Sequence, residues 1–270
     1  MTDREFKKIR KAFNSYAAEF QTANQDIQQN FDLKRIHSLY VAEEATALAR
    51  SLGLNNEEIR WARIMGLLHD VGRFEQYRQY QTFVDSRSQD HAALSVAVLK
   101  AGSILDGQPR PWIDLLLKAI SYHNRYQLPA SESPEVLFYT RLLRDADKLD
   151  IFRVVTEYYH RDSGPRNPAI ELGLPDTPEV SPGVLRDLQE CRSVDKRHVC
   201  TLNDFKLLQV GWVYDVNFPH TGRQILQRNI LDRIEAALPQ TSVIQETFET
   251  ARRFLAGRAD ETALAENRKK

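Results

Sequence analysis

Histidine and aspartate residues stand in apolar surroundings at several places between residues 37 and 147, and these residue types could do chemistry. The clearest case is GLLHDVGRF, residues 66–74, in which His69 and Asp70 are adjacent within an apolar stretch. Burying an imidazole and a carboxylate costs several kcal/mol unless another group compensates them. The stretch therefore predicts a partner for both side chains, and a divalent metal ion accepts both kinds of ligand.

Four further residues repeat this pattern, each on a different segment that is predicted to be helical. They are His37, His91, His123 and Asp147. Helical bundles build metal sites from side chains that project inward from facing helices. Taken singly, His91 or His123 would more often be a hydrogen-bonded core residue than a ligand. Asp147 could likewise pair with Arg144 or Lys148 on its own helix. Because five consecutive helices each deliver such a side chain, a shared metal site is the favoured interpretation.

The elements that must position these residues are predicted from apolar residues that recur at three- and four-residue steps. The expected helices cover residues 6–20, 33–52, 57–71, 90–100, 111–123, 134–158, 184–191, 224–238 and 244–258. Gly53 is a typical stop for the second helix, and Asn55 with Glu58 forms a capping-box pattern before the third. No segment alternates for long enough to predict a sheet, so the expected fold class is all-α.

The chain is expected to form a single all-α domain over residues 1–270. Residues 162–183 interrupt the helical pattern with many prolines and glycines, and they are predicted to form a loop that is either functional or mobile. The C-terminal helices, within residues 184–258, carry no motif that we can assign. Their aromatic residues Trp212, Tyr214 and Phe218 are expected to pack in the core.

Charge and hydropathy exclude several classes of partner. The chain has 37 basic and 37 acidic residues, so no global field favours a nucleic acid polymer or a membrane surface. No apolar run reaches the roughly 20 residues that span a bilayer, and the charged N-terminus lacks the core of a signal peptide. Cys191 and Cys200 are too few for a disulfide scaffold. We therefore expect a cytoplasmic protein with reduced thiols.

The order His, His-Asp, Asp along the chain resembles the HD-domain superfamily of metal-dependent phosphohydrolases. In that pattern, one metal is held by residues that match His37, His69, Asp70 and Asp147. Members with two metals add two intervening histidines, which match His91 and His123, and the carboxylate of the His-Asp pair bridges both ions. The resemblance covers residues from about 30 to 160. It implies an HD-domain helical bundle with additional C-terminal helices, and two divalent ions chosen among Fe, Mn, Co, Ni, Zn and Mg.

The resemblance implies hydrolysis of a small phosphoester, with a nucleotide as the expected substrate. Two ions can activate a water molecule near neutral pH, and Asp70 has two oxygens with which to bridge them. Arg73 is the best candidate to hold the phosphate, and Lys148 is the next. Arg73 could instead pair with Glu75, and Lys148 could be solvated or pair with Asp145.

Two other functions remain compatible with the same ligands. Some members of the superfamily carry two irons and use O₂ to oxidise a substrate. A degenerate HD module could instead bind a nucleotide and regulate a partner protein. The loss of a ligand position would favour such a module, and none of the six positions is lost. The ligands separate hydrolase from oxygenase poorly, because iron, manganese, cobalt and nickel all accept histidine and carboxylate. The phosphohydrolase is the favoured prediction.

Overall fold

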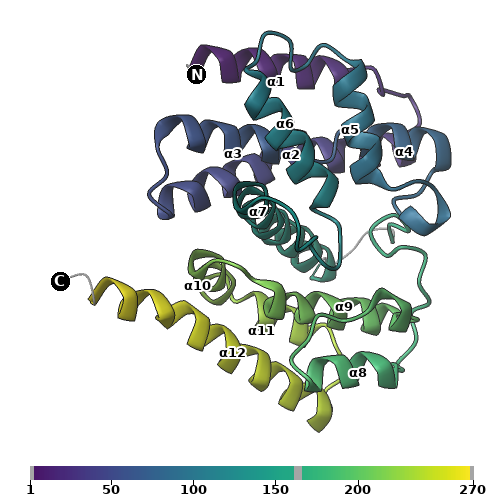
Figure 1. The fold of residues 1–270 in the computed structure, drawn as a ribbon. Coiled ribbons are helices and arrows are strands. Elements are labelled where there is room, and N and C mark those ends of the chain that lie inside the picture. Colours follow the sequence, from purple (N-terminus) through teal and green to yellow (C-terminus); the bar gives the residue numbers. More distant parts are fainter. Residues whose placement is uncertain (1–2, 161–165, 268–270) are drawn as a thin grey trace. The chain divides into compact units, whose positions relative to one another are not determined.

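The computed structural model describes residues 3–160 and 166–267, with the side chains of residues 4–160 and 166–259. Within these ranges the regular elements are all helices, so the all-α fold class is confirmed (Figure 1). None of the described helices is long and apolar enough to cross a membrane. The chain divides into two compact units, Met1–Asp150 (unit 1) and Ile151–Lys270 (unit 2). That the chain is a single domain stays a prediction.

Unit 1 contains the helices that carry the candidate residues. They are α1 (Asp3–Ala18), α2 (Gln25–Ser51), α3 (Asn56–Leu68), α4 (Gly72–Tyr80), α5 (His91–Ala101), α6 (Arg110–Tyr122) and the first part of α7 (Pro134–Tyr159). A short 3₁₀ turn, η1 (Asp85–Arg87), lies between α4 and α5. Helix α2 packs on α3, α4 on α5, and α5 on α6 (Figure 1). Contacts of α2 with α4 and of α3 with α6 join these pairs, which suits a site assembled from several helices.

Helix α2 begins eight residues before the predicted start at residue 33. The side chain of Asn24 caps it, because Asn24 Oδ1 accepts hydrogen bonds from the backbone N–H groups of Asp26 and Ile27 at 3.0 and 3.3 Å. The first turns of α2 are polar, so their apolar periodicity is too weak to predict a helix. The capping box at Asn55 and Glu58, by contrast, is present as predicted at the start of α3.

A glycine in α3 lets this helix approach α2 closely. A Cβ atom on Gly66 would lie 2.7 Å from Val41 O and 2.9 Å from Ala42 Cα, both in α2. The close approach brings the next turn of α3 against α2, and the ring centroids of His37 and His69 are 5.2 Å apart. The fold therefore depends on the absence of a side chain at residue 66.

Gly66→Ala is expected to lower the free energy of unfolding by about 1–3 kcal/mol or more, because the added methyl group meets backbone atoms that cannot rotate away. Urea unfolding followed by circular dichroism measures the change. Gly257→Ala is the matched control, since no atom lies within 4 Å of a Cβ built there. The control is expected to be neutral or stabilising by up to about 1 kcal/mol. Equal stability of Gly66→Ala and the parent would contradict the close approach.

The HD pair lies in a turn and not in a helix as predicted. Helix α3 ends at Leu68, and α4 begins at Gly72 after the turn formed by His69, Asp70 and Val71. The backbone N–H of Gly72 donates a hydrogen bond of 2.9 Å to Ser95 Oγ on α5. A Cβ on Gly72 would lie 2.8 Å from His91 O, so the start of α4 contacts α5 directly. The turn and this contact carry Asp70 to the beginning of α5.

Unit 2 contains the remainder of α7 and the C-terminal helices. They are α8 (Pro182–Gln189), α9 (Leu202–Gly211), α10 (Pro219–Gln227), α11 (Ile230–Ala236) and α12 (Ser242–Asn267). The predicted helix over 224–238 is wrong as one element, because Asn229 adopts a left-handed conformation, with a φ of 52°, between α10 and α11. Helix α9 was not predicted, although Thr201 and Asp204 form its capping box. Trp212 packs on Phe152 within this unit, with ring centroids 5.6 Å apart.

The predicted loop over 162–183 is described from residue 166 onward, and residues 161–165 lie outside the described residues. Residues 166–181 contain no helix, in agreement with the prediction. Helix α8 begins at Pro182, two residues before the predicted helix start, with proline at its first position. Proline is favoured there because its missing N–H would have no partner in the helix. The prolines and glycines thus predict the loop well and its end less well.

Candidate metal centre

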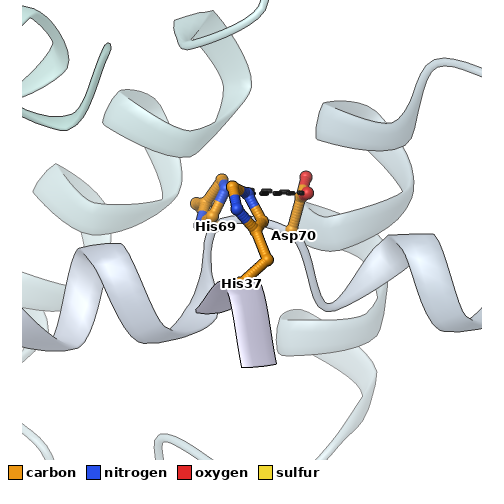
Figure 2. Close-up of side chains that lie close together, drawn as sticks. All are labelled: His37, His69 and Asp70. Atoms are coloured by element: carbon orange, nitrogen blue, oxygen red, sulfur yellow. Dashed lines mark ion pairs between the residues drawn. The ribbon is translucent and has the colours of Figure 1, made fainter. Parts of the chain in front are cut away.

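All six candidate ligands come together in unit 1, from five successive places along the chain. They are His37 from α2, His69 and Asp70 from the turn after α3, His91 from the start of α5, His123 from the end of α6 and Asp147 from α7. Figure 2 shows the two rings of His37 and His69 beside the carboxylate of Asp70. The four histidines and Asp70 are buried, while Asp147 keeps partial exposure. Their individual roles as metal ligands stay predictions.

The carboxylate of Asp70 lies at the middle of the cluster. Its Oδ2 atom lies 3.6 Å from Nε2 of both His37 and His69. Its Oδ1 atom lies 3.6 Å from Nε2 of His91 and 3.9 Å from Nε2 of His123. The two oxygens of one carboxylate therefore face two different pairs of histidines.

Asp147 lies beside the first of these pairs, His37 and His69. Its Oδ1 atom lies 3.1 Å from His37 Nε2 and 3.5 Å from His69 Nε2. We define the first ligand set as His37, His69, Asp147 and Asp70 Oδ2. We define the second ligand set as His91, His123 and Asp70 Oδ1. Ligand atoms of His37, His69 and Asp70 lie within 4.8 Å of one another, and so do those of Asp70, His91 and His123.

Each histidine is held through its other ring nitrogen, Nδ1. The Nδ1 atoms lie 2.7–2.8 Å from an acceptor, which is Asp150 Oδ2 for His37, Gly66 O for His69, Asp85 Oδ2 for His91 and Ile120 O for His123. A backbone carbonyl only accepts hydrogen bonds, so Nδ1 of His69 and of His123 must carry a proton. In a neutral ring of this kind Nε2 carries a lone pair. The hydrogen bond at Nδ1 orients the ring so that this lone pair points to the centre of the cluster.

The atoms at the centre fit a cation. Nε2 of His37 and of His69, Oδ1 of Asp70 and Oδ1 of Asp147 are buried and have no hydrogen-bond partner. Nε2 of His91 lies 3.1 Å from Nε2 of His123. Buried polar atoms without partners are rare and costly, and two facing lone pairs repel unless a proton or a metal ion compensates them. This set of imidazole and carboxylate atoms suits a divalent metal.

The carboxylates are ionised even though they are buried. Burial raises the pKa of Asp70, but the positive charge of Lys34 and the nearby His69 hold that pKa well below its usual range. Burial also raises the pKa of Asp147, and its contacts with His37 and His69 hold it well below the usual range. Both side chains are therefore in the state in which a carboxylate binds metal.

The second ligand set contains neutral histidines. Burial, together with the neighbouring His91 and His69, lowers the pKa of His123 to about 3. Burial and the positive charge of Arg73 lower the pKa of His91 as well. Neutral imidazole is the form that binds a metal ion, so these two residues need not lose a proton to do so.

His37 differs, and this gives a measurable proton release. Burial and Lys34 lower its pKa, but contacts with Asp147 and Asp150 outweigh them and raise it to about 9. Without metal, His37 is therefore charged at pH 7.5, and a metal ion must displace its proton. Calorimetric titration with Mn²⁺ in buffers of different ionisation enthalpy is expected to show release of about one proton at pH 7.5 and about half a proton at pH 9. No release at pH 7.5 would contradict a charged His37.

Three residues at this centre were missed in the sequence. Asp150 lies three residues after Asp147, so the helical spacing already placed it on nearly the same face of α7. Lys34, whose Nζ lies 2.8 Å from Asp70 Oδ2, is likewise one turn before His37 on α2. Asp85 carried no such signal, because it lies in η1, outside any predicted helix.

The two basic residues chosen from the sequence differ in their surroundings. Arg73 Nη1 donates hydrogen bonds to Phe83 O at 2.7 Å and to Asp85 Oδ1 at 3.1 Å. It pairs with Asp85 and, through Nε at 3.6 Å, with Asp70 Oδ1, while Glu75 pairs with Arg78. Lys148 is a buried residue of α7. That Arg73 or Lys148 binds phosphate stays a prediction.

Comparison with known proteins identifies the region that holds this centre. Residues 35–151 match the family model of the HD domain. No curated protein and no solved structure matches the chain. The matched range runs from α2 into α7 and agrees with the range of about 30–160 expected from the sequence. It contains all six candidate ligands, and the HD domain together with the buried cluster indicates divalent metal binding. Residues 35–151 of this chain are therefore similar to the HD domain, and this match supports a superfamily of the metal-dependent phosphohydrolase type.

Proposed function

We propose that unit 1 is a phosphohydrolase that holds two divalent ions and cleaves a small phosphoester, with a nucleotide as its substrate. The observation that carries the proposal is the position of Asp70, whose two oxygens face separate pairs of histidines. One ion would need only the first ligand set. His91 and His123 would then face each other through Nε2 atoms 3.1 Å apart, and a proton shared between the two rings would have to take the place of the cation.

The chain's own residues would orient and shield the reaction. Bound ions would supply a water molecule with a lowered pKa and stabilise negative charge on the phosphoryl group. The acceptors at Nδ1 hold each ring in one orientation, so the ligands need no rearrangement when charge develops. Burial of the histidines excludes other water from the centre.

The substrate would approach from the side where the centre meets solvent. The side chain of Asp147 is 18% exposed, that of Lys34 16% and that of Arg73 13%, whereas the side chain of Asp70 is 4% exposed. Two of these three more exposed residues are basic, which suits an anionic substrate. We retain Arg73 and Lys148 as proposed phosphate-binding residues.

Metal analysis combined with a substrate panel tests the proposal. The protein is purified without oxygen, loaded with one divalent metal at a time and assayed with nucleoside phosphates and with non-nucleotide phosphoesters, under air and under argon. We expect two equivalents of metal and phosphate release at equal rates in both atmospheres. A His69→Ala protein prepared in the same way controls for contaminating phosphatases.

Other outcomes would identify a different function or contradict one part of the proposal. Turnover that stops under argon and yields an oxidised product would identify a di-iron oxygenase. Nucleotide binding without turnover would identify a regulatory module. One equivalent of metal or fewer under saturating conditions would contradict the two-ion site, and release from non-nucleotide esters alone would contradict the nucleotide.

A further inference from the structure

We propose that Lys34 binds a phosphoryl oxygen of the substrate beside the metal centre, and that the substrate carries a doubly charged terminal phosphate. This inference rests on the proposed phosphohydrolase function and adds a substrate-binding residue to it. Lys34 lies on α2 one turn before His37, so both side chains leave nearly the same face of the helix. Its Nζ atom lies 2.8 Å from Asp70 Oδ2, the oxygen that also faces His37 and His69.

The surroundings of Lys34 hold its ammonium group at the edge of the centre. Nζ lies 5.2 Å from the centroid of the Phe83 ring, and Phe83 is itself buried. A cation over an aromatic ring is attracted by its electrons, and the aliphatic part of a lysine packs on apolar surface while its charge stays near solvent. An anion that enters from solvent can therefore contact Lys34 while remaining next to Asp70.

The charges around the histidines would leave Lys34 and Arg73 as excess positive charge once metal is bound. Four carboxylates contact the histidine rings, namely those of Asp70, Asp85, Asp147 and Asp150. Together they balance two divalent ions. Lys34 and Arg73, which contact Asp70 and Asp85, then give the site an excess of positive charge, and such a site favours an anionic ligand.

The position of Lys34 also says what kind of anion is needed. A metal ion bound to Asp70 Oδ2 would share that oxygen with the ammonium group, and like charges within about 4–6 Å repel. An anion that contacts both the ammonium and the metal side of the centre relieves this repulsion. A terminal phosphate with two negative charges can do so with separate oxygens, whereas a phosphodiester has a single negative charge to offer.

Arg73 is less suited to this role because its guanidinium group already has protein partners. Arg73 Nη1 donates to Phe83 O, to Gln76 Oε1 and to Asp85 Oδ1. Among the described residues Lys34 has one such hydrogen-bond partner, Asp70, which is the residue that a metal ion would bind. A bound metal ion would therefore weaken the ion pair between Lys34 and Asp70 and leave the ammonium group available to a ligand.

Binding of inorganic phosphate to the Mn²⁺-loaded protein tests the proposal. Calorimetry at pH 8 is carried out on the parent, on Lys34→Met, which keeps the length of the side chain, and on Lys34→Arg, which keeps the charge. Arg35→Met is the matched control, since Arg35 is the next basic residue of α2 and its only ion pair within the described part of the chain is with Asp32, at 3.9 Å. The affinity for Mn²⁺ is measured separately for each protein by competition with a chelator.

We expect Lys34→Met to bind phosphate about 10- to 100-fold more weakly, as for the loss of one charge-assisted hydrogen bond. Its affinity for Mn²⁺ should be unchanged or higher, because a cation next to Asp70 is removed. Lys34→Arg should retain most of the phosphate affinity, and Arg35→Met all of it.

Several results would overturn the inference or one part of it. Phosphate affinity equal to the parent's in Lys34→Met would show that the ammonium does not contact phosphate. A parallel fall in Mn²⁺ affinity would show that Lys34 supports Asp70 instead. A parent protein that binds Mn²⁺ but no phosphate would also overturn the inference, and dimethyl phosphate binding as tightly as phosphate would overturn the doubly charged ligand. A parent that binds no divalent metal would instead refute the proposed function.

Discussion

Asp70→Ala is expected to abolish activity and to weaken the binding of both metal ions together. Both oxygens of this carboxylate face histidine nitrogens, so its loss removes a ligand from each of the two sets. It also leaves the partly buried Lys34 beside histidines without its counter-charge. We expect a loss in kcat/KM of about 1,000-fold or more, about 4 kcal/mol, down to background. Steady-state kinetics and elemental analysis of the same sample measure the two effects.

Asp32→Ala is a suitable control because Asp32 is a partly exposed carboxylate on α2 whose only close basic neighbour among the described residues is Arg35, at 3.9 Å. It should keep both its metal content and its activity. Circular dichroism must show that Asp70→Ala remains folded, since an unfolded variant would lose metal for another reason. If folded Asp70→Ala retained both ions and most of its turnover, Asp70 could not bridge them. Loss of one ion only would assign Asp70 to a single set.

Asp150→Asn and Asp85→Asn are expected to weaken different ions. Asp150 holds His37 of the first ligand set, and Asp85 holds His91 of the second, each at 2.7 Å from Nδ1. An amide binds a ring N–H more weakly than a carboxylate does and can present its own N–H instead, so the ring is less well oriented. Loss of such a partner typically lowers metal affinity about 10- to 100-fold. Titration with Mn²⁺ followed by electron paramagnetic resonance separates single ions from coupled pairs.

A second variant identifies which ion is affected. On a His91→Ala background, Asp85→Asn should have no further effect on metal affinity, because the ring that Asp85 holds is already gone. Asp150→Asn should keep its full effect on that background. If both substitutions weakened both ions equally, the two ligand sets would not be separate sites. Asp85 also bonds to Arg73 and Gln76, so thermal unfolding of Asp85→Asn must be measured beside its metal affinity.

The sequence determined the candidate residues and the helical fold of this protein. His69 and Asp70 stand out because ionisable groups are costly in an apolar stretch, and that cost needs no structure to recognise. The three- and four-residue recurrence of apolar side chains predicted helices because one face of each must be buried. Helix α2 shows the limit of this reasoning, since its polar first turns depend on the cap at Asn24 and not on periodicity.

Only the tertiary structure decided how the candidate residues meet. The two oxygens of Asp70 face separate pairs of histidines because of the turn between α3 and α4 and the contact of Gly72 with α5. That Asp85 and Lys34 belong to the centre depends on which neighbouring backbone each side chain can reach. These relations are distances between helices, which are decided by backbone contacts such as those at Gly66. The periodicity of a sequence reports which face of a helix is buried, but it does not report which residue of another helix lies opposite, because that depends on how closely the two backbones can approach.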